Sequence, residues 1–160
     1  MQLAIIIKRI VIALIVFLFV IVILGPLLLY WGGLFGVNGR PEPSSLQLTE
    51  SEREYVWRKV RGSGEPKVIP ITPYEFLSAN AQGDERKPGL QLANWVSRSY
   101  LLNGNYEFKR TLLRHLSGAA LTIWLTRNWT TDQILYSASE LLKLEQANPA
   151  FKRDALKRAP

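Results

Sequence analysis

The side chains best suited to bind a charged ligand are arginines in the C-terminal half of the chain. A guanidinium group presents a rigid fork of N–H donors that matches phosphate and carboxylate groups. Arginine therefore suits an anionic ligand such as a pyrophosphate. The candidate ligand contacts are Arg98, Arg110, Arg114 and Arg127. The alternative for each is an ordinary surface arginine that is solvated or ion-paired.

Groups for nucleophilic or metal chemistry are scarce. The chain has no cysteine and a single histidine, His115, which excludes disulfides, thiolate metal sites and clustered-histidine zinc sites. It contains no G-x-S-x-G elbow and no glycine-rich phosphate loop. We therefore predict no catalytic residue, no metal and no cofactor. Paired carboxylates stay open, because acidic side chains could approach one another in the fold, among them Glu75, Asp84, Glu85 and Glu107.

The longest element that must position these groups is an apolar N-terminal stretch. Every residue from Ile10 to Leu24 is apolar, and the run continues to Tyr30. A helix needs about 20 such residues to cross a bilayer core. We predict a membrane anchor over residues 1–35 that contacts lipid through Ile10–Tyr30. A cleaved signal peptide would have a shorter apolar part and a small-residue cleavage site.

Charge next to the apolar run predicts its orientation. Lys8 and Arg9 precede it, and the positive-inside bias then keeps the N-terminus in the cytoplasm. We expect a single-pass protein of the inner (cytoplasmic) membrane whose C-terminal domain is extracytoplasmic. Without these two residues the net charge of +7 falls to +5 (7 − 2). A basic domain next to a membrane suits anionic lipid headgroups or an anionic polymer as a partner. The alternative is a soluble surface that happens to be basic. No basic run or aromatic ladder suggests nucleic acid as a partner.

The rest of the chain reads as a linker and one small helical domain. Residues 36–47 carry two glycines, two prolines and two serines, which is typical of a linker. Residues 48–160 are long enough for one domain with its own core. Capping-box pairs Thr49/Glu52 and Thr72/Glu75 start two of its helices, and Thr130 with Gln133 starts another. The predicted helices run over about 49–61, 72–83, 88–102, 107–127 and 130–148. Strand alternation is absent, so the predicted fold class is all-α.

The predicted helix over 107–127 is the expected centre of the domain. One apolar stripe at helical spacing consists of Leu112, Leu116, Ala119, Ala120, Ile123 and Trp124. A second apolar edge, Leu121 and Leu125, lies beside it. A helix that is apolar on two sides packs against more than one neighbour.

The segment 107–140 resembles the family 51 peptidoglycan glycosyltransferases. It is similar to their pattern R-T-x-x-R-K-x-x-E-x-x-x-A-x-x-L-E-R-x-Y-S-K-D-E-I-L, with His115 at the lysine and Thr122 at the alanine. The matching residues are Arg110, Thr111, Arg114, Leu125, Arg127, Trp129, Thr130, Asp132, Ile134 and Leu135. Residues 88–104 lie where the family has its G-G-S-T-I-T-Q-Q-L-A-K helix. The anchor followed by a helical head resembles the monofunctional members.

The resemblance implies a lysozyme-like, transglycosylase-like helical domain that handles a lipid-linked disaccharide. The family's general base is a glutamate in an E-D-x-x-F motif, and Thr72 stands at that position in Thr72-Pro73-Tyr74-Glu75-Phe76. The family's second glutamate falls on Gly118. Its serine-threonine-glutamine signature falls on residues 89–94 and is lost, and its lysine position is Ser97, beside Arg98. Neither Thr72 nor Gly118 can act as a base.

The leading interpretation is a catalytically inactive glycosyltransferase-like domain of the bacterial cell envelope. It would act by binding a peptidoglycan precursor or a membrane-protein partner. One alternative is an active transglycosylase with a relocated carboxylate, Glu75 or Glu85. Another is a scaffold component of a membrane assembly unrelated to glycan.

Overall fold

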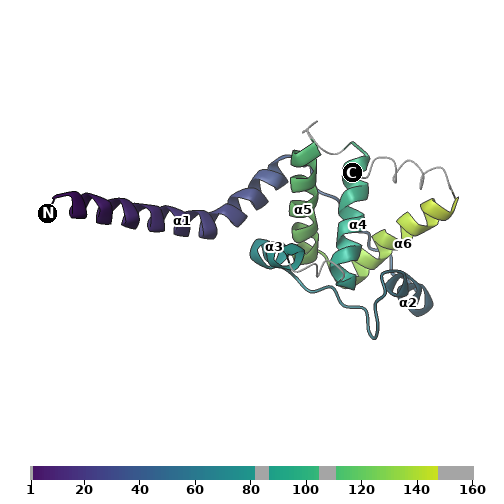
Figure 1. The fold of residues 1–160 in the computed structure, drawn as a ribbon. Helices are drawn as coiled ribbons and strands as arrows, with labels where there is room; N and C mark the ends of the chain where they lie inside the picture. Colours follow the sequence, from purple (N-terminus) through teal and green to yellow (C-terminus); the bar gives the residue numbers. More distant parts are fainter. Residues whose placement is uncertain (1, 82–86, 105–110, 148–160) are drawn as a thin grey trace.

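The computed structural model describes residues 2–81, 87–104 and 111–147, and every regular element in these ranges is a helix. The all-α prediction is thereby confirmed, whereas the lysozyme-like identity of the head stays a prediction. The elements are α1 (Gln2–Phe35), α2 (Glu50–Lys59), α3 (Pro73–Ala81), α4 (Pro88–Leu102), α5 (Thr111–Asn128) and α6 (Thr131–Ala147). In Figure 1, α1 projects from a compact group of the other five helices as a long rod.

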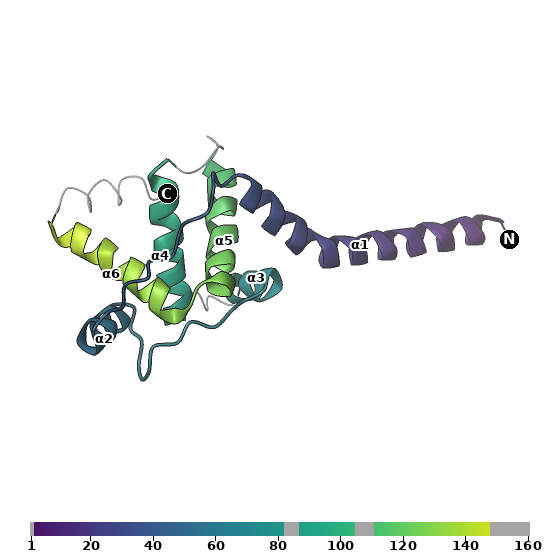
Figure 2. The same ribbon diagram turned by 180° about the vertical axis from the view of Figure 1, so that it is seen from behind.

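The group of five helices, which we call the head, is built around α5. Helix α4 packs beside α5, α6 crosses α4, and α2 rests on α6 (Figures 1 and 2). Helix α3 and the C-terminal part of α1 lie against α5 on the side that faces the rod. The residues of the core with the largest fully buried side chains come mainly from α4, α5 and α6: Leu92, Leu121, Leu125, Ile134 and Leu135.

Polar pairs fix the starts of three helices, as the sequence predicted. The Thr49 side chain accepts from the Glu52 N–H, and the Glu52 carboxylate accepts from the Thr49 N–H. Thr72 with Glu75 and Thr130 with Gln133 make the same reciprocal bonds. These bonds satisfy N–H groups that a helix start leaves without intrahelical partners. The expected start of a helix at 107 and the tail beyond 148 lie outside the described residues.

The predicted apolar stripe of α5 is buried only in part: Ala120 and Ile123 are buried and Trp124 packs against the core. Leu112, its first member, is 78% exposed. Leu116 and Ala120 lie against α1. The second edge, Leu121 and Leu125, is fully buried in the core of the head. Helix α5 is central because α1 covers one of its faces and α4 covers another.

Small polar residues let α4 approach α5 closely. Ser97 of α4 and Thr122 of α5 both donate to the carbonyl oxygen of Gly118, each at 2.8 Å. Ser97, Thr122 and Gly118 are buried. A hydroxyl buried without a partner would cost free energy, and these two hydroxyls are satisfied where the backbones meet. The contact holds α4 and α5 as one unit.

Candidate functional site

The most distinctive surface of this chain is the junction at which α1 meets the head. Gly33 lies so near α5 that an added Cβ would be 2.6 Å from the Leu116 carbonyl oxygen and 2.7 Å from the Ala120 Cβ. Leu34 and Val37 beside it are buried. Small residues at a helix crossing let two backbones approach this closely. The end of the apolar helix is therefore part of the head, and it is not a free tether.

Arg40 closes the C-terminal end of α1. Its guanidinium donates to the carbonyl oxygens of Leu34, Val37 and Gly39 at 3.3, 3.4 and 2.6 Å. The same group lies 5.9 Å from the ring centroid of Trp124 on α5, within reach of a cation–π interaction. The carbonyls at the end of a helix lack intrahelical partners. Arg40 thus joins the end of α1 to α5, a role that the sequence did not indicate.

A second link joins the middle of α1 to α3. Pro26 lies inside α1, and the rod bends along its length (Figure 1). A proline has no N–H, so the carbonyl of Val22, four residues earlier, loses its helical partner, and the helix bends there. The Tyr74 hydroxyl of α3 donates to the next carbonyl, that of Ile23. The contact fixes α3 beside the bend.

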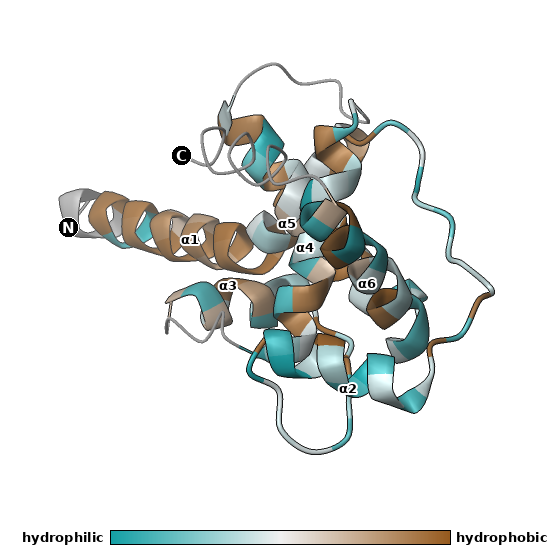
Figure 3. Cartoon of the chain, turned by 90° about the vertical axis from the view of Figure 1, so that its right-hand side faces the viewer, coloured by the Kyte–Doolittle hydropathy of each residue, from teal (hydrophilic) through white to brown (hydrophobic). Residues whose placement is uncertain are grey.

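The face of α1 opposite the head is apolar and exposed. Leu24, Leu28, Trp31 and Phe35 follow one another at spacings of four, three and four residues, which places them on one side of a helix. Leu28, Trp31 and Phe35 are 69%, 66% and 82% exposed. Gly33 and Val37 face the head. We call the four exposed residues the α1 stripe. Figure 3 shows apolar residues along α1 up to the head.

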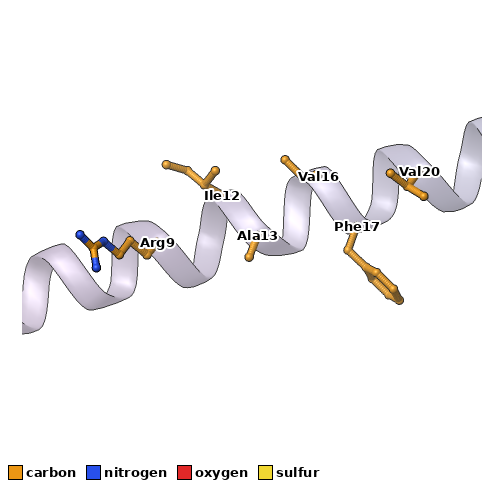
Figure 4. A pocket seen from close by; sticks show the side chains of 6 residues that line it. All are labelled: Arg9, Ile12, Ala13, Val16, Phe17 and Val20. Carbon is orange, nitrogen blue, oxygen red and sulfur yellow. The ribbon is translucent and has the colours of Figure 1, made fainter.

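A hollow lies along the N-terminal half of α1, well away from the head (Figure 4). One helix alone lines it: Arg9, Ile12, Ala13, Val16, Phe17 and Val20. It is a shallow groove in the side of an exposed helix, formed where the small Ala13 lies between longer side chains. Such a groove cannot enclose a small molecule. It can receive a side chain from a neighbouring helix or a lipid chain.

The candidate arginines do not form one cluster. Arg114 lies in the first turn of α5 and Arg127 in its last. They are thirteen positions apart on the helix (127 − 114), which is about 20 Å and more than a pyrophosphate can bridge. Arg98 is an exposed residue of α4. Arg110 lies outside the described residues. Arg127 is exposed, and it belongs to the last turn of α5, the helix against which α3 packs.

Glu75, one of the two candidate carboxylates of an active transglycosylase, already accepts a hydrogen bond at the start of α3. The Glu75 carboxylate accepts the Thr72 N–H at 2.6 Å. This bond, and then the Thr72 hydroxyl, lowers the Glu75 pKa. A general base near neutral pH needs a raised glutamate pKa, so Glu75 is adapted to capping α3. Glu85 lies outside the described residues.

The positions that correspond to the family's glutamates do not meet in a site. Thr72 caps α3, whereas Gly118 is buried between α4 and α5. Across the described part of the chain, no group of three or more His, Asp or Glu side chains could hold a metal ion. A small cleft between α2 and α6 is lined in part by Glu52 and Lys143, and Lys143 pairs with both Glu52 and Glu140. These side chains are exposed and form a surface network.

Comparison with known proteins adds no family to this picture. No family model, no curated protein and no solved structure matches the chain. The resemblance of residues 107–140 to peptidoglycan glycosyltransferases therefore stays a prediction. In the part of the chain that the structure describes, one helix, over Ile6–Phe35, has the length and composition to cross a membrane.

Proposed function

We propose that this chain is a single-pass membrane protein whose helical head is joined rigidly to the span and acts by binding. The observation that supports the proposal best is the contact of Gly33 with α5, which makes the end of α1 part of the head. A rigid junction fixes the head at one height and angle relative to the bilayer. A binding protein at a membrane surface benefits from that geometry, because it presents one face to partners in the same membrane.

The length of α1 allows it to span a bilayer and also pack on the head. The apolar helix over Ile6–Phe35 has 30 residues, which corresponds to about 45 Å. A hydrocarbon core is about 30 Å thick. If the core is crossed between Ile10 and Leu29, the residues from Tyr30 to Phe35 remain to pack on the head. Lys8 and Arg9 would lie at the cytoplasmic headgroups, with the head outside the cytoplasm in the cell envelope.

The partner that fits best is a membrane helix of another protein. The α1 stripe is apolar, lies opposite the head and continues toward the groove at Ala13. Apolar side chains of one helix entering the hollows of another are the usual packing between membrane helices. Binding rather than catalysis is supported by the capping role of Glu75 and by the burial of Gly118.

Site-specific photo-crosslinking tests this proposal in intact membranes. A photoreactive residue at Leu28 or Trp31 should give one discrete protein adduct, and the same residue at Arg58, exposed on α2, should not. The adduct at Leu28 should disappear when Trp31→Ala is added. An adduct the size of two copies would identify a homodimer, and lipid adducts alone would contradict a protein partner.

A second candidate function is binding of a lipid-linked glycan precursor. The supporting observation is that the exposed Arg127 belongs to the last turn of α5, the helix that both α1 and α3 contact. A lipid-linked pyrophosphate would lie at that level, and guanidinium suits it. The test is binding of precursor to the full chain in nanodiscs, with Arg127→Ala and the control Arg98→Ala. Loss with Arg127→Ala alone supports the candidate, and equal binding by all three chains contradicts it.

A further inference from the structure

We infer that α3 is an interfacial helix that lies in the outer leaflet of the bilayer beside α1. The inference rests on the proposed span and extends it. It assigns to α3 a direct contact with lipid acyl chains and headgroups through Tyr74 and Leu77. The occupant of this surface is the bilayer itself, and no second protein is required.

The position of α3 relative to α1 is fixed by a direct bond. The Tyr74 hydroxyl donates to the Ile23 carbonyl oxygen, and α3 packs against both α1 and α5. Figure 1 shows α3 at the side of the head nearest the rod. Because Ile23 belongs to the apolar run, whatever surrounds that part of α1 also reaches the start of α3.

The depth of α3 follows from the length of the span. About 20 helical residues counted from Ile10, the first after Lys8 and Arg9, cross the core and end at Leu29. Ile23 lies six residues before Leu29, which is about 9 Å along the helix. Helices that lie in the membrane interface bury their apolar face about 5–10 Å below the headgroups. The bond to Ile23 therefore places Tyr74 at the depth of an interfacial helix.

The outward side chains of α3 suit that depth. Tyr74 and Leu77, three residues apart, are 41% and 44% exposed, while Ala79 is buried against the head. Ile69, just before α3, is also exposed. The Ser78 hydroxyl donates to the Glu75 carbonyl oxygen within α3, so it needs no water. A tyrosine with an apolar ring and a bonded hydroxyl is typical of the interface.

The charges around α3 are compatible with a headgroup region. Glu75 is the one acidic residue of its first turn. Two cations, Lys87 and Arg127, lie near enough to help to lower the Glu75 pKa. Arg127 lies in the last turn of α5 and is exposed. The long arginine side chain lets its guanidinium reach toward the lipid phosphates, to which it can bind.

Depth-dependent quenching in nanodiscs that hold one chain tests the inference without a protein partner. The chain has no cysteine, so single-cysteine variants carry one fluorescent probe each. The variants are Leu77→Cys, the membrane reference Val16→Cys and the aqueous reference Arg58→Cys. Nitroxide-labelled lipids should remove most of the emission at positions 16 and 77, and aqueous iodide should quench position 58 alone.

The references separate the two ways in which the inference can fail. If the probe at position 16 is quenched by lipid and the probe at 77 by iodide, α1 spans and α3 lies in water, which overturns the inference. If the probe at position 16 is quenched by iodide, the span itself is wrong and the inference fails with it. Lipid quenching at 77 that disappears in Tyr74→Phe would show that the bond to Ile23 sets the depth of α3.

Discussion

Gly33 of α1 packs so closely on Ala120 of α5 that a Cβ on Gly33 would lie 2.7 Å from the Ala120 Cβ. The neighbouring Gly32 has nothing within 4 Å of the same built atom. Two adjacent glycines of one apolar helix thus have opposite environments. The contact at Gly33 turns an apparent membrane tether into a structural part of the head.

The first prediction uses these two glycines as a matched pair. Gly33→Ala must push α1 away from α5, and overpacking of this kind costs about 1–3 kcal/mol. Gly32→Ala adds a methyl group in open space and should stabilise α1 by up to about 1 kcal/mol through helix propensity. Thermal unfolding of both variants in detergent measures the difference. Equal stability of the two would contradict the packing at Gly33.

The second prediction concerns the position at which the glycosyltransferase family has its second glutamate. Gly118→Glu would place a carboxylate between α4 and α5 without a partner, and the head should lose about 3 kcal/mol or more. Gly118→Ala should be tolerated, because its Cβ would be 3.7 Å from Leu101. Chemical denaturation of both variants checks this. A stable, folded Gly118→Glu protein would mean that this position faces a site.

The third prediction is a pH dependence from the capping glutamates. The Thr49 and Thr72 N–H groups, and then their hydroxyls, lower the pKa of Glu52 and Glu75. A carboxyl whose pKa is lower in the folded state stabilises the fold above its ordinary pKa. That stabilisation is lost as pH falls through the lowered pKa. Stability should therefore decrease in acid, starting near the ordinary glutamate pKa.

Unfolding curves over a series of acidic pH values measure this effect. Glu75→Gln keeps an oxygen acceptor for the Thr72 N–H but cannot titrate, so its stability should fall less in acid than that of the parent chain. Glu65→Gln, at an exposed loop position, is the control and should retain the parent slope. A Glu75→Gln slope as steep as that of the parent would contradict the capping role.

The fourth prediction concerns the guanidinium that closes α1. Arg40→Ala leaves the carbonyls of Leu34, Val37 and Gly39 without this donor and removes the contact with Trp124. We expect a loss of about 1–2 kcal/mol. Arg40→Lys should recover only part of it, because an ammonium group lacks the planar fork. Thermal unfolding measures the stability, and limited proteolysis measures how easily the segment that follows residue 40 is cleaved. Full recovery by lysine would show that charge alone matters.

Sequence patterns predicted local features well. The capping pairs and the bounds of α4 follow from Thr, Glu, Gln, Pro and Asn at fixed offsets, which act within one turn. The contacts between distant segments could not be predicted in this way. Gly33 meets Ala120 across 87 positions (120 − 33), and Tyr74 meets Ile23 across 51. A glycine in an apolar run gives no sign of which helix will cover it.

The same limit applies to the candidate site. The candidate arginines suggested anion binding from their chemistry alone. Whether their side chains lie close together depends on the tertiary structure, which local patterns do not predict. Helix geometry separates Arg114 from Arg127 by about 20 Å. Arg40, which joins α1 to α5, was not among the arginines that the sequence suggested as ligand contacts. Its role depends on the end of α1 turning toward Trp124.

Cysteine crosslinking in isolated membranes tests the rigid junction most directly, since the chain has no native cysteine. A disulfide needs Cβ atoms about 3.5–4.5 Å apart, which Gly33→Cys with Ala120→Cys reaches after a shift of about 1 Å. We expect rapid intramolecular crosslinking of this pair on mild oxidation and none for Gly32→Cys with Ala120→Cys. Equal crosslinking of the two pairs, or none in either, would contradict a head fixed to its membrane helix.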